Sequence, residues 1–150
     1  MSSLKTQLYQ LCLTFIQNRL DNIEYSMLQA RQASNDDTKS SAGDKYETTR
    51  EMMQQEMDRN SKLLYEAGQQ KIALQQIENV DVANEVKNGS LVMTSNGNFY
   101  ISISAGELST EGQSFIAVSQ AAPIGRGFIG KRMGEELNFN GKNYIINQIL

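Results

Sequence analysis

The sequence predicts an α+β protein, in which a long antiparallel α-helical hairpin is followed by a small antiparallel β domain. Three observations lead to this class. No proline occurs between Ser3 and Glu78, and apolar side chains recur there at helical spacing. A polar cluster interrupts that spacing near residue 40. From Gly89 onward the apolar residues recur at every second position, which is the period of a β-strand.

Two apolar stripes define the helical part. The first consists of Leu4, Leu8, Leu11 and Phe15, followed after a slip by Ile16, Leu20, Ile23 and Met27. The second consists of Met53, Met57, Leu64, Ala67 and Leu74, with the polar residues Asn60 and Lys71 at stripe positions. Steps of three and four place each stripe on one face of a helix. Polar residues within such a seam often set the register of a coiled coil.

The cluster Asn35–Gly43 between the stripes consists of helix breakers and capping residues. Two apolar stripes joined by a short polar loop predict an antiparallel helical hairpin. With roughly 30 to 35 residues in each arm and about 1.5 Å of rise per residue, the hairpin would be a rod of order 45–50 Å. Few compact domains need a helix pair of that length, so we expect a probe or a spacer.

Alternating residues predict the strands of the second part. Phe99, Ile101 and Ile103 are separated by Tyr and Ser, which is typical of a half-buried strand. Further strands are expected at Ser90–Thr94, Ser114–Ser119, Glu135–Phe139 and Asn143–Ile149, with hairpin turns at Asn96-Gly97 and Asn140-Gly141. The segment from Pro123 to Lys131 predicts a loop with one helical turn.

These elements predict two domains, a hairpin over residues 1–79 with an acidic tip near residues 36–47, and a β domain over residues 80–150. The β domain has only about 60 residues in its patterned part, so its core would be marginal by itself. Met52, Met53 and Met57 stand at helical spacing, and we expect them in the core rather than on a recruitment surface.

Composition excludes several classes of function. The chain has no histidine, which removes Ser-His-Asp and Cys-His triads and His-liganded zinc. Its single cysteine, Cys12, lies among apolar residues and is predicted to be a buried structural thiol. The net charge of −3 argues against general phosphate-backbone binding, so we expect no direct sequence-specific DNA binding.

The sequence contains no stretch of about 18 apolar residues, so we expect no membrane span. Its first residues lack the basic start and apolar run of a signal peptide. A lone cysteine also suits a reducing compartment. Together these features predict a cytoplasmic protein.

Carboxylates collect at the predicted tip: Asp36, Asp37, Asp44 and Glu47. Asp44 and Glu47 are three residues apart and would share one face at the start of the second helix. Two such groups could help hold a hard divalent cation such as Mg²⁺, with water and ligands from elsewhere completing its shell. The same pair also fits a capping box, with an Asp N-cap and a Glu at N3. The two interpretations are compatible, and both stay open.

Glycines and basic residues gather between Gly125 and Arg132. A phosphate cradle is disfavoured there, because no Walker pattern is present and no helix of useful length follows. We expect a turn with an exposed basic rim.

Two motifs resemble the bacterial transcript-cleavage factor family, GreA and GreB. Gly43-Asp44-Lys45-Tyr46-Glu47 resembles the family's tip motif Gly-Asp-x-x-Glu. The segment from Ala122 to Lys131 is similar to the family's Ser-Pro-Ile-x-x-x-Leu-Ile-Gly-Lys, and it follows the tip motif at a distance of about 80 residues. The chain departs from the pattern at Ala122, where the family has serine, and at residues 48–51, where the family has Asn-Ala-Glu-Tyr. These departures indicate a divergent member.

The resemblance implies a coiled-coil hairpin followed by a domain of FKBP-like type. It also implies a transcription elongation factor that binds RNA polymerase through its secondary channel, with the loop around Ala122, Pro123 and Ile124 as the contact. Asp44 and Glu47 would then help hold the second Mg²⁺ of the polymerase and act on the water that cleaves backtracked RNA. The chain would be no enzyme by itself but would stimulate RNA cleavage by the polymerase, with only indirect effects on the nascent RNA 3′ end. We expect a monomer.

Other functions stay open. A regulator could enter the same channel without promoting cleavage, and a structural coiled-coil adaptor would have no polymerase role. An FKBP-like domain also suggests a peptidyl-prolyl isomerase. This last function is disfavoured because the chain has no tryptophan and only scattered Phe and Tyr for an aromatic-lined cleft.

Overall fold

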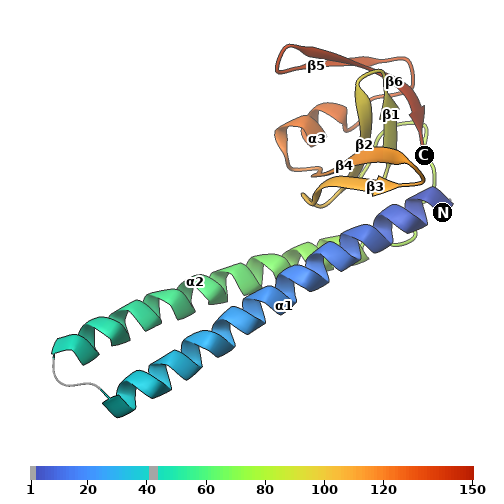
Figure 1. The fold of residues 1–150 in the computed structure, drawn as a ribbon. Coiled ribbons are helices and arrows are strands. Elements are labelled where there is room, and N and C mark those ends of the chain that lie inside the picture. Colours follow the sequence, from blue (N-terminus) through green and yellow to red (C-terminus); the bar gives the residue numbers. More distant parts are fainter. Residues whose placement is uncertain (1–2, 41–43) are drawn as a thin grey trace. The chain divides into compact units, whose positions relative to one another are not determined.

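The computed structural model describes residues 3–40 and 44–150, with side chains throughout except at residues 34–47 and 49. Two long helices are followed by strands and one short helix (Figure 1). The elements are α1 (Ser3–Ser40), α2 (Asp44–Gln75), β1 (Leu91–Thr94), β2 (Gly97–Ser102), β3 (Gly106–Thr110), β4 (Gln113–Ser119), α3 (Pro123–Phe128), β5 (Glu136–Phe139) and β6 (Lys142–Ile149). The predicted α+β class is confirmed. The coiled-coil form and the FKBP-like type stay predictions.

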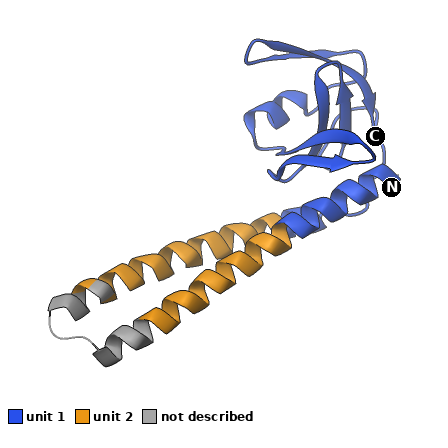
Figure 2. Ribbon diagram, in the orientation of Figure 1, with its two compact units in different colours: residues 1–15, 71–150 blue, residues 16–70 orange. Residues whose placement is uncertain are grey.

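The chain folds into two compact units (Figure 2). The sheet unit combines Met1–Phe15 with Lys71–Leu150, and the hairpin unit is Ile16–Gln70. The predicted domain boundary at residues 79 and 80 follows the end of the helical sequence and stays a prediction. The contacts divide the chain within α1 and within α2 instead, so the first turns of α1 and the last turn of α2 belong with the sheet.

In the hairpin unit, α1 and α2 run antiparallel (Figure 2). The buried residues lie seven positions apart on each helix: Ile16, Ile23 and Ala30 on α1, and Asn60 and Ala67 on α2. A seven-residue repeat of buried positions keeps one seam of a helix on its partner. At one end of this seam the Arg19 guanidinium donates to Gln70 Oε1 and lies 3.9 Å from a carboxylate oxygen of Glu66.

Two predictions about the helices are wrong. The expected loop begins at Asn35, but α1 continues to Ser40. Residues 35–40, which join α1, include neither proline nor glycine, and extending an existing helix adds one hydrogen bond for each residue fixed. Met52 is 64% exposed rather than part of a core, and Met53 is only half-buried.

The sheet has six strands in the order β3-β4-β2-β1-β6-β5. It is mixed rather than antiparallel, because β2 and β4 run parallel, with Phe99 beside Ile116. The other neighbours are antiparallel. The chain leaves β2, forms β3 at the sheet edge and returns as β4 between β3 and β2. A hairpin inserted in this way requires β4 to run in the direction of β2.

The sequence predicted no strand at β3. The turn that joins β3 to β4 is Glu111-Gly112, and both residues have positive φ, 54° and 73°. Positive φ at both central residues is the type I′ hairpin geometry, in which Asn-Gly is the common pair. The predicted turn at Asn140-Gly141 has the same geometry, with φ of 50° and 79°, and is confirmed.

Both faces of the sheet are covered at β2. On one face, the rings of Phe99, Phe128 and Tyr144 pack with centroids 5.0 to 6.0 Å apart, and aliphatic residues of β1, β2 and β6 surround them. On the other face, Tyr100 and Ser102 of β2 are also buried, contrary to the predicted half-buried strand.

The first turns of α1 supply the second cover. The thiol of Cys12 lies 3.7 Å from the Ser102 hydroxyl, and Leu8 is fully buried one turn earlier. Nearby, the Lys5 ammonium donates to the carbonyl of Val80 at 3.2 Å. The sheet core is therefore completed by residues far from it in sequence, which relieves the shortage of core expected for the β segment by itself.

Candidate functional site

The tip motif falls at the connection between the two long helices. α1 ends at Ser40 and α2 begins at Asp44. The side chains of Asp44 and Glu47 lie outside the described residues, as does the rest of the predicted acidic tip. Their roles as catalytic carboxylates, Mg²⁺ ligands or helix caps therefore stay predictions.

The second motif forms α3 and its two flanks. Ala122 is extended, with φ of −68° and ψ of 150°, as expected for a residue before proline. Pro123 then occupies the start of the helix, where its fixed φ fits and its missing N–H costs no hydrogen bond. The N–H of Arg126 donates to the Ala122 carbonyl at 2.8 Å, and the N–H of Ile129 donates to Gly125 at 3.1 Å. The expected loop with one helical turn is confirmed.

Ser119, the last residue of β4, holds the entry to α3 in place. Its hydroxyl accepts a hydrogen bond from the N–H of Ala121 at 3.1 Å, and its carbonyl accepts one from the N–H of Ala122 at 3.0 Å. A Cβ added at Gly125 would lie 2.1 Å from the same carbonyl oxygen. Gly125 is thus required because the helix backbone passes directly against the end of the strand.

The three predicted contact residues differ in exposure. Pro123 is exposed, whereas Ala122 and Ile124 are half-buried, and Ile124 packs against the aromatic core. Phe128, at the other end of α3, is fully buried in that core. The helix is therefore anchored from below by Ile124 and Phe128 and presents Pro123 at the surface.

Sequence reasoning missed two exposed apolar residues beyond α3. Ile129 is 38% and Met133 65% exposed. Backbone hydrogen bonds of 2.8 Å fix this stretch, from Gly130 N–H to the Val86 carbonyl and from Val86 N–H to the Lys131 carbonyl. The sequence held a signal for Ile129 and Met133, because each of them precedes a glycine within a basic segment. The expected basic rim is confirmed at Arg126 and Arg132, which are both exposed.

Outside these motifs, the described residues group neither a reactive thiol nor metal-binding side chains. Cys12 is buried, as predicted, and burial raises the pKa of its thiol to about 11, although the Ser102 hydroxyl lowers it in part. A thiol in that state is a poor nucleophile. Among the residues that the structure describes, no three His, Cys, Asp or Glu side chains are grouped to hold a metal ion. No helix in the described part of the chain is long and apolar enough to span a membrane.

No family model matches the chain, and no curated protein matches its sequence. Among solved structures, the chain is similar to the crystal structure of GreA factor homolog 1 (Gfh1) of Thermus thermophilus. The sequence identity is 13%, the match covers 97% of this chain and 94% of that chain, and the TM-score is 0.36. This is a distant likeness to a GreA homologue, and a TM-score of that size carries no weight in an argument about function.

Proposed function

We propose that the chain is a transcription elongation factor of the GreA type that binds RNA polymerase through its secondary channel. The observation that carries this proposal is the place of the tip motif. α1 ends at Ser40 and α2 begins at Asp44, so the Gly-Asp-x-x-Glu pattern falls at the start of α2, between the two long helices. A five-residue pattern is weak evidence of function by itself. Its position between two long helices makes it stronger evidence.

In this proposal the tip carboxylates act in the active site of the polymerase. Asp44 and Glu47 would offer two hard oxygen ligands to the second Mg²⁺, which the polymerase and its RNA would otherwise hold weakly. A carboxylate beside that ion would also orient the attacking water or accept its proton. The product would be a new RNA 3′ end from which elongation restarts. The chain would supply side chains to this reaction but would be no enzyme by itself.

The sheet unit would supply the contact with the polymerase surface through Ala122, Pro123 and Ile124. Pro123 is exposed on a helix whose entry is fixed by Ser119, so little conformational entropy would be lost on binding. Ile129 and Met133 would extend this surface with apolar area. We also propose that the chain acts as a monomer in the cytoplasm.

A second candidate function is a regulator that enters the same channel without promoting cleavage. The sequence after the tip motif favours it, because Thr48-Thr49-Arg50-Glu51 replaces the family's usual continuation. The two functions differ only in what the tip does once it reaches the active site.

The deciding experiment measures RNA cleavage in a purified backtracked elongation complex, with polymerase from the same source. The wild-type chain is compared with the double variant Asp44→Ala/Glu47→Ala at matched occupancy of the polymerase. The matched control is Glu51→Ala/Asp58→Ala, which removes two exposed carboxylates from the same helix and changes the net charge equally.

We expect cleavage with the wild type and with the control but not with the tip variant. Binding without cleavage by any of the three would favour the regulator. Absence of binding would reject the polymerase function and leave the structural adaptor.

A further inference from the structure

The outer edge of β3 is an unpaired sheet edge. β3 is the first strand in the sheet order and pairs with β4 but with no other strand of the described chain. β3 and the first turns of α1 both belong to the sheet unit, so the surroundings of this edge lie within one compact unit. An open edge with free backbone groups is a template for another strand.

The turn at Glu111-Gly112 determines which backbone groups are free. A two-residue type I′ turn is closed by a hydrogen-bonded pair, here Thr110 and Gln113. Hydrogen-bonded and non-hydrogen-bonded pairs then alternate along an antiparallel ladder. The N–H and C=O groups of Ser109 and Glu107 therefore point away from β4, toward the open edge.

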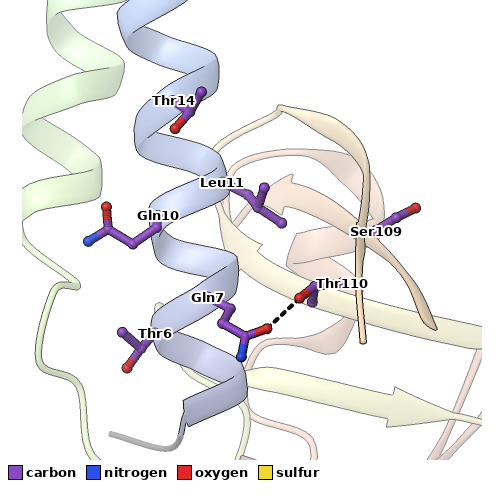
Figure 3. A pocket seen from close by; sticks show the side chains of 7 residues that line it. All are labelled: Thr6, Gln7, Gln10, Leu11, Thr14, Ser109 and Thr110. Carbon is purple, nitrogen blue, oxygen red and sulfur yellow. Dashed lines mark hydrogen bonds between the residues drawn. The ribbon is translucent and has the colours of Figure 1, made fainter. Parts of the chain in front are cut away.

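A groove runs beside this edge (Figure 3). It has a volume of about 340 Å³ and is lined by one face of α1 and by the end of β3: Thr6, Gln7, Gln10, Leu11, Thr14, Ser109 and Thr110. In Figure 3 the side chain of Ser109 points away from α1, so Ser109 lines the groove through its backbone. A groove with a helix face on one side and free strand groups on the other offers the chemistry that an added strand needs.

One end of the groove is closed by hydrogen bonds. The Thr110 hydroxyl donates to Gln7 Oε1, and Gln7 Nε2 donates to a carboxylate oxygen of Glu111 at 3.0 Å. These bonds hold the helix face against the hairpin turn. The groove is thus preorganised, which lowers the cost of ordering it on binding.

We propose that this groove binds an extended, basic segment of a partner protein, which adds to the sheet as a strand beside β3. The proposal is independent of the polymerase function, since it uses neither the tip nor α3. Backbone pairing with Glu107 and Ser109 would supply most of the affinity, and the flanking side chains would supply selectivity.

Charge favours a basic partner. Glu107 and Glu111 are both exposed on the hairpin of β3 and β4, and Ser114 donates to Glu107 at 2.6 Å. The only cation within residues 3–15 and 104–114 is Lys5, which is 1% exposed. A second copy of the chain would bring two more carboxylates to the same ribbon, and like charges along paired strands repel.

The pleat also predicts the pattern of the partner sequence. Residues of an added strand opposite Glu107 and Ser109 would lie on the Glu107 face, where lysine or arginine is favoured. The alternate residues would point toward α1, where Leu11 is half-buried and Thr14 is exposed. Small apolar side chains fit there. The partner segment should therefore alternate between basic and small apolar residues.

The test is fluorescence anisotropy of the full chain with a labelled seven-residue peptide of alternating lysine and valine. Ser109→Pro removes an outward N–H and obstructs the edge, but it leaves the hydrogen bonds from β3 to β4 in place. We expect it to weaken binding by at least about tenfold, a loss of roughly 1.4 kcal/mol.

The chain offers a matched control at the opposite edge of the sheet. Asn138 of β5 stands one residue before the pair that closes the Asn140-Gly141 turn, so its N–H also points outward. Asn138→Pro is the same chemical change at the same ladder position, and it should leave binding unchanged. A peptide of alternating glutamate and valine should bind weakly to every variant.

A second variant keeps the test decisive if Ser109→Pro does not fold. Thr14→Arg changes an exposed helix residue and places a cation in the groove, so it should also weaken binding of the basic peptide. Full binding by both folded variants, or equal losses with Asn138→Pro, would overturn the proposal. Equal binding of the acidic peptide would overturn its charge selectivity. A dimer of the free chain that Ser109→Pro dissociates would assign the edge to a second copy instead.

Discussion

The two units of the chain bury very different side chains. In the sheet unit, three aromatic rings pack in mutual contact, and large residues such as Leu8 and Tyr100 are fully buried. Among the described side chains of the hairpin unit, the buried ones are Ile16, Ile23, Ala30, Asn60 and Ala67, so none is aromatic and only two are large and apolar. A fully buried large apolar side chain contributes about 1.5 to 3 kcal/mol, so most of the hydrophobic stabilisation must come from the sheet unit.

Each unit also contains a buried polar atom without a partner among the described residues. In the hairpin unit it is Nδ2 of Asn60, and in the sheet unit there are two, the hydroxyl of Tyr100 and Oδ1 of Asn88. The sheet unit balances this cost with many buried apolar side chains, whereas the described part of the hairpin seam buries two large ones, Ile16 and Ile23. The sheet unit is therefore stabilised mainly by tertiary packing, and the hairpin unit depends more on the intrinsic helix preference of its residues.

The largest expected effect tests the core of the sheet unit. Phe128→Ala removes a fully buried ring from the aromatic cluster and should lower the free energy of unfolding by about 3 to 5 kcal/mol. In the hairpin unit, Tyr65→Ala removes a ring that is 68% exposed and should change it by no more than about 0.5 kcal/mol. Urea denaturation followed by circular dichroism measures both. Similar losses for the two variants would refute the contrast between the units.

The next effect tests the close passage of α3 against β4. Gly125→Ala would set a Cβ 2.1 Å from the carbonyl oxygen of Ser119, so the backbone must move. We expect a loss of about 1 to 3 kcal/mol in the free energy of unfolding. Under the polymerase proposal, binding should weaken as well, because the movement displaces Pro123. A variant as stable as the wild type would show that the entry to α3 adjusts freely.

A third prediction concerns alkaline pH and the burial of Cys12 between α1, which carries it, and the sheet. The folded state raises the pKa of this thiol from 9.0 to about 11, so it keeps a proton that the unfolded chain has lost. Between pH 9 and 11 the thiol should therefore reduce stability as pH rises, by at most about 1.4 kcal/mol per pH unit.

Cys12→Ala should flatten this slope, whatever it does to stability at pH 7. Burial also raises the pKa values of Tyr9 and Tyr100, so part of the alkaline loss should remain in the variant. Unfolding free energies measured at intervals from pH 8 to 11 give the two slopes. Equal slopes would mean that the segment of α1 carrying Cys12 has already left the sheet before the thiol ionises.

Much of this fold could be predicted from local pattern. The helical period, the alternation of β2 and the Asn140-Gly141 turn are all properties of short segments, and the structure confirms the elements they predict. The conformation of Ala122 and Pro123 was predicted as well, because proline fixes its own φ and restricts the residue before it.

What the pattern missed depends on tertiary contact. Tyr100 and Ser102 read as the exposed side of β2, and they are buried only because the start of α1 covers them. β3 was missed because its turn uses Glu111 in a conformation usually taken by asparagine or glycine. The groove beside β3 could not be predicted, since its two walls are about 100 residues apart in sequence.

The smallest predicted change is a gain in stability, and it concerns the hairpin unit. Gly68 lies within α2 in the hairpin unit, and a Cβ added there would have no atom within 4 Å. Glycine in a helix interior costs about 0.5 to 1 kcal/mol relative to alanine, because the unfolded chain loses more freedom at glycine. Gly68→Ala should therefore raise the free energy of unfolding of the hairpin unit by that amount, while Gly125→Ala lowers that of the sheet unit.

Replacement of glycine by alanine should thus change the free energy of unfolding in opposite directions at the two positions. Close packing requires glycine at position 125, whereas a Cβ at position 68 has open space around it. Amide hydrogen exchange separates the units, since slower exchange should be confined to residues 16–70 in Gly68→Ala. Faster exchange there, or an unchanged hairpin, would mean that the seam of the hairpin unit rather than helix preference limits its stability.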